Sequence, residues 1–111
     1  MENKSISRLR GMLGFAMRAG KVIIGTELVT VAMKRKGNDR IRITLVASDA
    51  SEATKKKIRT KGEFYDIEVR EIELDTATLG ELLAKTYGPA TVAICDDGFA
   101  KEIRAALASE T

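Results

Sequence analysis

The sequence predicts an α/β protein, a three-layer α/β/α sandwich around a four-stranded mixed sheet. Segments with helical periodicity alternate with short apolar segments through the whole chain, which is typical of a sheet covered by helices on both faces. The 111 residues are enough to bury one core. Since no repeat, low-complexity segment or linker interrupts the alternation, we expect residues 1–111 to form a single domain.

The chain is expected to open with a helix, a strand and a second helix. Residues 5–18 carry apolar side chains at helical spacing, and Gly20 ends this helix. Residues 22–24 form a short strand, and the turn at Gly25 and Thr26 starts the second helix. Its expected buried side chains are Leu28, Val31 and Ala32, and its end carries Lys34, Arg35 and Lys36.

The middle of the chain predicts the central strand. Residues 41–47 are rich in β-branched side chains and nearly continuously apolar, which is typical of a strand buried on both faces. Residues 48–51 offer side-chain oxygens that cap a helix, which we expect over residues 51–59. Residues 66–72 alternate in character, which indicates an outer strand with one face in water.

The last part of the chain predicts two helices and a second buried strand. Residues 75–78 cap a helix that runs to residue 85, and residues 87–89 form a turn. Residues 91–95 form the buried strand, and residues 96–98 open the final helix.

Charge is distributed unevenly along the chain. The net charge is +3, but residues 1–61 hold 15 Lys and Arg against 5 Asp and Glu, a net +10. Residues 62–111 hold 4 against 11, a net −7. Such asymmetry favours a polyanionic partner, nucleic acid above all, bound mainly by the first half of the chain. The alternative is a solvated basic face.

Several function classes lack the residues that they need. The chain has no histidine, which removes the commonest general base and transition-metal ligand. Cys95 is the only cysteine, so no intrachain disulfide forms, and at the end of an apolar strand it is expected to be a structural thiol. We find no signal peptide and no apolar run of about 20 residues, and therefore expect a cytoplasmic protein that does not enter a membrane.

The segment from Gly20 to Gly25 resembles a phosphate-binding P-loop only in the spacing of its glycines. A P-loop needs Lys-Ser or Lys-Thr after the second glycine, whereas Thr26 and Glu27 follow here. No G-x-G-x-x-G motif follows a predicted strand. The segment does predict a strand that enters a helix through glycine, which leaves backbone N–H groups free to meet an anion such as phosphate.

Asp96 and Asp97 lie between a predicted strand and a predicted helix, and they allow two interpretations. Adjacent carboxylates there could hold magnesium, or they could cap the N-terminus of the helix. Capping is favoured. Asp49 likewise could hold magnesium or cap a helix, and capping is favoured there too. We therefore expect no metal, no cofactor and no catalytic residue.

The densest basic run is Lys55, Lys56, Lys57, Arg59 and Lys61. On a helix these side chains cannot all face one way, so contact with phosphates and a solvated face both stay open.

Aromatic residues are few, 3 Phe and 2 Tyr, which disfavours a stacking surface for single-stranded RNA. Recognition of a folded or kinked RNA by its shape fits better. A compact loop could pack against an unstacked base, the alternative being a plain turn with its tyrosine at the edge of the core. Its residues are Tyr87, Gly88, Pro89 and Ala90.

Four segments together resemble the ribosomal L7Ae/L30e family, with the greatest likeness to its small bacterial members of the YlxQ type. They are residues 13–21 (LGFAMRAGK), 25–28 (GTEL), 45–51 (LVASDAS) and 92–100 (VAICDDGFA). The resemblance covers about residues 5–107, and it rests on the order and spacing of the segments.

The resemblance implies an α/β/α sandwich that binds kink-turn RNA, a sharply bent helix with tandem sheared G·A pairs. It implies that the loop at Gly25 enters the bend beside those pairs, and that residues 87–90 shield bases flipped out by the bend. Lys21 and Lys34 would contact phosphates.

The chain departs from the family pattern just after Gly25. Archaeal and eukaryotic members carry Asn-Glu after the glycine and a lysine one turn into the helix. Aligned without gaps, Glu27 takes the Asn position, Leu28 the Glu position and Val31 the Lys position, whereas a slip of one residue would put Glu27 on the Glu. The resemblance therefore implies weaker or different base-specific contacts here.

Taken together, the residues and the resemblance predict a non-enzymatic, ribosome-associated protein that binds kink-turn or similarly bent RNA as a monomer. The expected RNA-binding residues are Lys21, Gly25, Thr26, Glu27, Leu28, Val31, Lys34, Lys36, Tyr87, Gly88, Pro89 and Ala90. One alternative is a protein-interaction module of the same fold, which would show no salt-dependent RNA affinity. Another is an RNA-modifying enzyme or its accessory domain, against which the missing histidine, cofactor fingerprint and acid–base pair argue.

Overall fold

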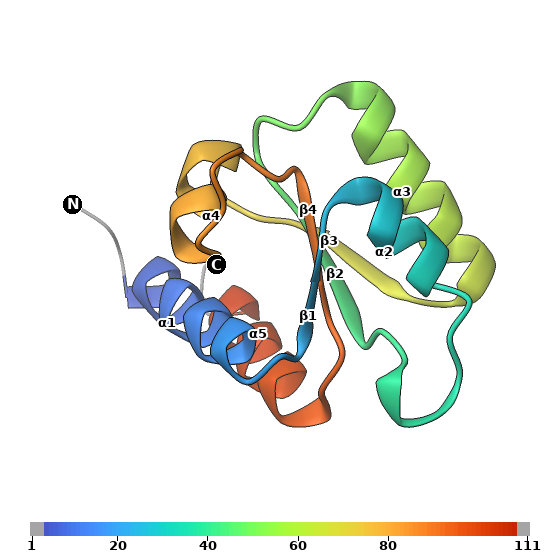
Figure 1. Cartoon of the computed structure of the whole chain (residues 1–111), viewed down its shortest axis with the longest axis horizontal. Coiled ribbons are helices and arrows are strands. Elements are labelled where there is room, and N and C mark those ends of the chain that lie inside the picture. Colours follow the sequence, from blue (N-terminus) through green and yellow to red (C-terminus); the bar gives the residue numbers. More distant parts are fainter. Residues whose placement is uncertain (1–3, 109–111) are drawn as a thin grey trace.

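Helices and strands alternate as predicted in the computed structural model, which describes residues 4–108 (Figure 1). The elements are α1 (Lys4–Arg18), β1 (Val22–Ile24), α2 (Thr26–Ala32), the 3₁₀ helix η1 (Gly37–Asp39), β2 (Ile43–Val46), α3 (Glu52–Tyr65), β3 (Glu68–Glu71), α4 (Thr76–Leu82), β4 (Thr91–Ile94) and α5 (Asp97–Ala108).

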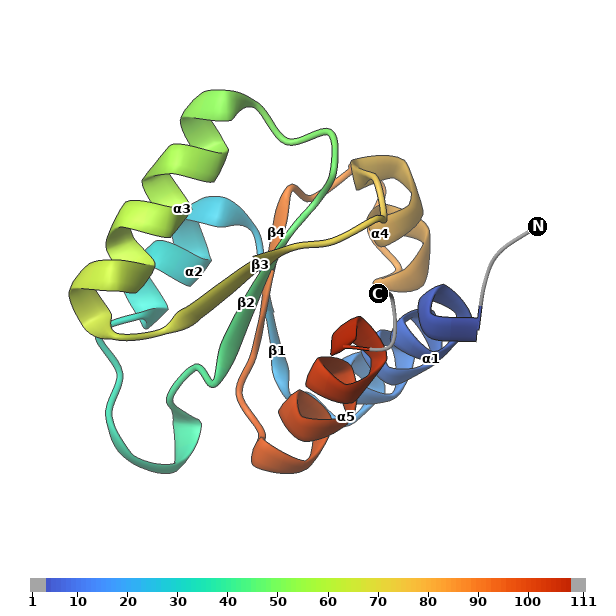
Figure 2. The same ribbon diagram turned by 180° about the vertical axis from the view of Figure 1, so that it is seen from behind.

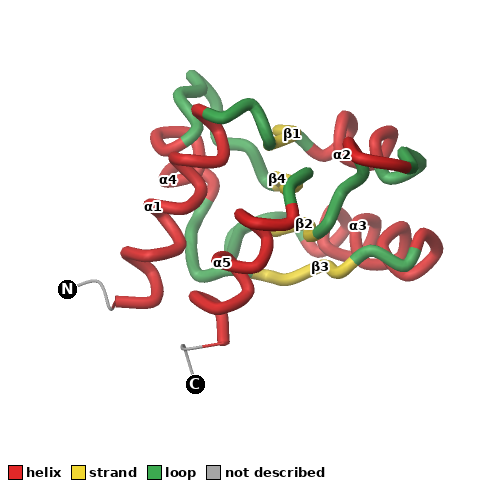
Figure 3. The backbone as a smooth tube through the Cα atoms, turned by 90° about the horizontal axis from the view of Figure 1, so that it is seen from below, coloured by secondary structure: helices red, strands yellow, loops and turns green. Residues whose placement is uncertain are grey.

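The strands form one mixed sheet in the order β1-β4-β2-β3. β4 runs antiparallel to both of its neighbours, and β2 and β3 are parallel. α2 and α3 cover one face, and α1, α4 and α5 cover the other (Figures 2 and 3). The predicted three-layer α/β/α sandwich is thereby confirmed.

Each face of the sheet has its own apolar cluster. Ile43, Leu45, Val92 and Ile94 project toward the helices α1, α4 and α5, where Leu9, Leu13 and Ile103 are fully buried. On the other face Val46 and Ala93 meet α2 and α3 through Val29, Ala32 and Ile58. Because side chains alternate along a strand, β2 and β4 supply both clusters, and every residue of these two strands is buried.

Polar caps begin three of the helices where the sequence predicted them. The Ser51 hydroxyl accepts from the N–H of residue 54, and the Asp75 carboxylate accepts from the N–H of residue 78. Asp96 Oδ2 accepts from the Phe99 N–H at 3.0 Å, so Asp96 has the predicted capping role.

Asp49 differs from the prediction, because it does not cap the helix that follows it. Its two carboxylate oxygens accept from the N–H and the hydroxyl of Thr76, at 2.8 and 3.0 Å. Thr76 is the first residue of α4, so Asp49 stabilises the start of a helix that is distant in sequence.

Three predicted helix ends were wrong. α3 continues past residue 59 to Tyr65, because Gly62 lets the helix pass close to β3 and Asp66 ends it in a left-handed conformation with φ of 57°. α4 ends at Leu82 and not at residue 85. α2 ends at Ala32, so the basic residues 34–36 follow the helix instead of forming its last turn.

Gly62→Ala is expected to lower the free energy of unfolding by about 1–3 kcal/mol, because the core is overpacked by the new side chain. The added Cβ would overlap Val69 Cγ2 and would lie 2.9 Å from Ile67 O. The matched control is Gly11→Ala in α1, where no atom lies within 4 Å of the added carbon. This control should raise the free energy of unfolding by about 0.5–1 kcal/mol. Urea denaturation measures both, and equal effects would contradict the prediction.

Candidate nucleic-acid interface

The register of the sheet brings three loops together. Ile24 at the end of β1 and Val46 at the end of β2 lie beside the first residues of β4, and parallel pairing places the end of β3 there too. We call this the Gly25 end of the sheet. The turn at Gly25, residues 47–51 and residues 87–90 meet there (Figure 1).

Gly25 makes the turn from β1 into α2. Its φ of 107° and ψ of 140° lie in a region that L side chains rarely adopt. Its N–H donates to Thr91 O and its carbonyl accepts from the Val29 N–H, both at 2.9 Å. No side chain caps α2, and the structure shows no acceptor for the N–H groups of residues 26–28 among the residues it describes.

Thr91 ties the loops of this end to one another. Besides accepting from Gly25, this fully buried residue has its hydroxyl 2.9 Å from that of Thr26. The preceding residue, Ala90, accepts from the Ala47 N–H at 2.9 Å. The Gly25 turn and the residue 87–90 loop are therefore held side by side by hydrogen bonds before any partner binds.

The loop of residues 87–90 packs closely on α4. Pro89 is buried, whereas the side chain of Tyr87 is 54% exposed and so lies outside the core. Gly88 is required by space, since a Cβ there would lie 2.9 Å from the backbone of Thr76. A loop packed closely on α4 thus presents one exposed aromatic side chain.

Leu28 and Val31 are exposed, at 64% and 66%, so the prediction that α2 buries them was wrong. α2 instead buries Val29, Ala32 and the following Met33, which lie at an equally good helical spacing. The exposed pair lines a shallow hollow of about 410 Å³. Its other lining residues are Ile23, Ala32, Lys34 and Arg35.

Glu27 projects from the first turn of α2 and is 81% exposed in its side chain. Its Oε1 accepts from Lys57 Nζ of α3 at 2.8 Å. This hydrogen bond and the charge of Lys57 lower the pKa of Glu27, which therefore carries its negative charge at neutral pH.

The three lysines predicted to bind phosphate lie in different places. Lys34 follows α2 and lines a hollow between α2 and α3, and Lys36 is exposed just before η1. Lys21 precedes β1, and its carbonyl accepts from the Cys95 N–H at 2.9 Å. The structure therefore places Lys21 at the opposite end of β1 from Gly25.

The basic run on α3 divides between two directions. Lys55 Nζ lies 3.2 Å from Glu71 and is largely buried, so it serves the fold. Lys57 and Lys61 face α2. Their spacing of four residues puts both lysines on one face of α3, but no signal in the sequence showed that this face would meet Glu27.

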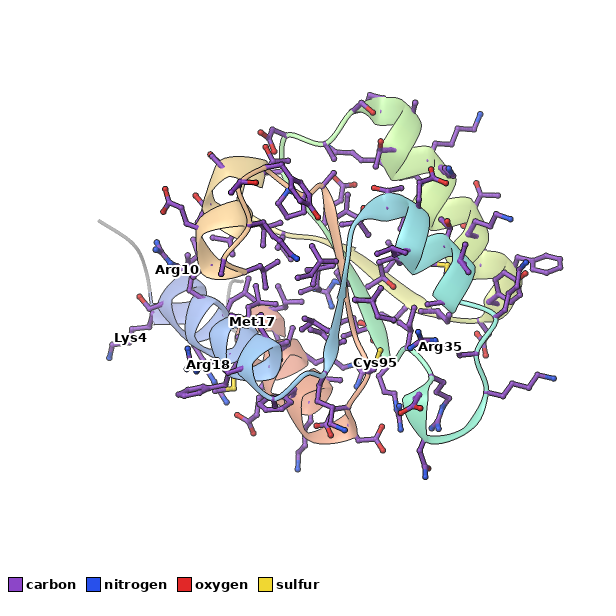
Figure 4. All side chains as sticks on the ribbon, viewed as in Figure 1. Lys4, Arg10, Met17, Arg18, Arg35 and Cys95 are labelled. Atoms are coloured by element: carbon purple, nitrogen blue, oxygen red, sulfur yellow. The ribbon has the colours of Figure 1, made fainter. Side chains whose placement is uncertain are left out.

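Cys95 lies at the Lys21 end of the sheet, close to Arg35 (Figure 4). It is half-buried, and burial raises the pKa of its thiol, an effect that the positive charges of Arg35 and Arg42 partly offset. Arg42 itself is held by Asp97, with 2.9 Å between Nε and Oδ1. This arrangement agrees with a structural thiol.

Within residues 4–108, no three His, Cys, Asp or Glu side chains gather in a way that could hold a metal ion. In the same residues, no helix combines the length and apolar character needed to cross a membrane.

Comparison with known families and curated proteins gives a family and several relatives, two of which share one name. The model of the Ribosomal protein L7Ae/L30e/S12e/Gadd45 family matches residues 7–104. A protein from Enterococcus faecium named RNA-binding protein YlxQ is 38% identical over 105 residues, which cover 94% of this chain and 95% of the relative. Its namesake from Bacillus subtilis (strain 168) is 36% identical over 92 residues, 83% of this chain and 87% of the relative.

Two solved structures share the fold. A protein with unknown function from Bacillus halodurans C superposes with a TM-score of 0.79 and 28% identity, covering 90% of this chain and 96% of the other. The 15.5kD RNA binding protein of Giardia lamblia gives a TM-score of 0.75, with coverage of 98% and 89%. At 11% identity the second likeness shows the fold alone.

Alkylation of Cys95 by iodoacetamide is expected to be slower in the folded protein than in concentrated urea. The thiolate is the reactive form, and burial disfavours it in the folded state. The midpoint of the pH–rate profile should therefore lie above the unfolded value of about 8.5. By the same linkage, the free energy of unfolding falls as the pH rises through that value, and Cys95→Ser should lack this fall. Equal midpoints in the folded and unfolded states would contradict the assignment.

Proposed function

The chain belongs to the Ribosomal protein L7Ae/L30e/S12e/Gadd45 family, and we propose that it is a non-enzymatic protein that binds a kink-turn or similarly bent, structured RNA. The observation that supports this most is the Gly25 end of the sheet. There the uncapped start of α2 and the loop of Tyr87 are fixed beside each other through Thr91. The name RNA-binding protein, which the curated relatives carry, supports RNA as the partner. We propose that the protein acts as a ribosome-associated monomer in the cytoplasm.

Each part of this end has a proposed contact. The free N–H groups near Gly25 and Thr26 meet a phosphate or a base edge, since helix starts attract negative charge. The Glu27 carboxylate accepts from a guanine amino or imino group, as acidic side chains accept from base donors. Tyr87 and the rest of its loop, Gly88, Pro89 and Ala90, cover a base that the bend has flipped out.

Leu28 and Val31 set the limit of base-specific recognition. Both are exposed on α2, so they touch the RNA by apolar contact alone. A leucine accepts no hydrogen bond from a base, and a valine offers no charge to a phosphate. Base-specific hydrogen bonding from α2 side chains therefore rests on Glu27.

The three lysines expected to bind RNA, Lys21, Lys34 and Lys36, contact different parts of its backbone. Lys34 and Lys36 neutralise phosphates beside and beyond α2. Lys21 lies four strand positions from Gly25, about 13 Å along β1, and meets phosphates of another segment. An RNA that contacts all of them has to extend along the α2 side of β1.

A second candidate, a protein-interaction module of this fold, is favoured by the exposed apolar pair Leu28 and Val31. It predicts no salt-dependent RNA affinity, whereas phosphate contacts make affinity fall steeply with salt.

Gel shifts with a kink-turn RNA, and with the same RNA in which Watson–Crick pairs replace the sheared G·A pairs, test the proposed function. We expect the first RNA to bind at least about 10-fold tighter, which corresponds to the loss of one good base contact. Gly25→Ala should reduce that preference, because the torsion angles of the turn do not suit alanine. Equal binding of the two RNAs by the native protein would overturn the kink-turn proposal.

Lys34→Gln is expected to weaken RNA binding and to reduce the slope of log K against log salt by about 0.9 if one phosphate contact is lost. The matched control is Lys101→Gln, an exposed position on α5 across the sheet from α2. Fluorescence anisotropy over a salt series measures both slopes. A slope that falls equally in the two variants would show that only net charge matters.

A further inference from the structure

A groove between α2 and α3 includes Glu27, Val31 and Lys34, for which contacts are proposed above, but its α3 side has no proposed contact. We call it the α2–α3 groove; it encloses about 240 Å³. Residues 27, 30 and 31 line it from one stripe of α2, residue 34 lines it from just after this helix, and Lys57 and Lys61 line it from α3. Its lining residues are Glu27, Thr30, Val31, Lys34, Lys57 and Lys61.

The polar groups of the groove are three ammonium groups, one carboxylate and one hydroxyl. The Thr30 hydroxyl donates to the Glu27 carbonyl at 2.8 Å, so its proton is already used. The only carboxylate, that of Glu27, takes one hydrogen bond from Lys57 Nζ. The groove therefore offers cationic donors in excess, and one of them is neutralised in the free protein.

We propose that the α2–α3 groove binds the phosphodiester backbone of the RNA through Lys57 and Lys61, and that Glu27 holds Lys57 until an RNA base takes the carboxylate. The proposal rests on the proposed RNA-binding function, and it adds a second contact surface and a coupling between the two.

A phosphodiester chain fits this groove better than a single small anion. Lys57 and Lys61 lie one turn apart on α3, and Lys34, just after α2, lines the other side, so the three ammonium groups flank an open groove instead of a closed pocket. Glu27 belongs both to the lining of this groove and to the first turn of α2. A strand that leaves the Gly25 end of the sheet along α2 passes directly over the groove.

The Glu27–Lys57 pair is weak enough to exchange partners. The two side chains are 81% and 44% exposed, and an exposed pair of this kind contributes at most about a fivefold factor to an equilibrium. A base that donates to Glu27 releases Lys57 for a phosphate. An RNA without such a base leaves the carboxylate among the phosphates, where it repels them. The pair therefore favours the bent RNA over a plain duplex.

The test compares four variants on two RNAs, a kink-turn and its counterpart without G·A pairs, over a salt series. Lys57→Gln and Lys61→Gln should each weaken kink-turn binding by about 3–10-fold and reduce the salt slope by about 0.9. Glu27→Gln should weaken kink-turn binding but strengthen binding of the counterpart, because Lys57 is then free. Lys56→Gln is the matched control, an exposed lysine of α3 outside the groove, and should bind as the native protein does. Thermal unfolding checks that each variant is folded.

The outcomes separate this inference from the proposed function. If Lys57→Gln and Lys61→Gln bind RNA as Lys56→Gln does while the native protein still prefers the kink-turn, phosphate binding in the α2–α3 groove is overturned and the proposed function is not. If the native protein binds both RNAs equally but these two variants bind both more weakly, kink-turn recognition is overturned and RNA binding by the α2–α3 groove is supported. A Glu27→Gln variant that binds the counterpart no better than the native protein overturns the coupling. Absence of salt-dependent binding to either RNA overturns both proposals.

Discussion

The position of β4 between β1 and β2 is the constraint on which the rest of the structure depends. Every residue of β4 is fully buried, and its backbone is paired on both sides. Its side chains alternate between the two apolar clusters, and a slip by one residue would exchange the large Val92 and Ile94 with the small Ala93, so the register of this strand is strongly specified. The first residue, Thr91, therefore stands at a fixed place, and it holds the turn at Gly25 through its carbonyl and hydroxyl. The candidate interface thus takes its geometry from the core and not from the loops themselves.

The order and type of the elements could be predicted from the sequence, because they depend on local periodicity and on capping oxygens such as those of Ser51 and Asp96. The family could also be predicted from the order of four short segments. The sequence did not show which face of α2 is exposed. One apolar stripe begins at Leu28 and another, equally apolar, begins at Val29, and only packing against the sheet decides which of them is buried. The salt bridge between Glu27 and Lys57 depends on how α2 and α3 pack together, which could not be predicted from a single sequence. The individual RNA contacts remain predictions.

The uneven charge of the chain does not translate directly into an equally uneven surface. Part of the positive charge of the first half is neutralised within the fold, where Lys55 meets Glu71 and Arg42 meets Asp97. What is left for a partner is concentrated on the side of α2 and α3, including Lys34 and the exposed lysines of α3. The net charge of each half of the chain therefore favoured a polyanionic partner, while the ion pairs within the fold decide which basic side chains stay free to contact one.

The packing of α1 against α5 has a consequence for the timing of folding. The two helices lie side by side on one face of the sheet, and Arg8 of α1 is 2.6 Å from Glu102 of α5. β1 likewise pairs with β4, some seventy residues further along. During synthesis the segment from β4 to α5 emerges last, so until then α1 lacks its helix neighbour α5 and β1 lacks its strand neighbour β4. The native sheet and the α1–α5 contact are completed only when these distant segments meet, and such non-local pairing is slower to form than local contacts.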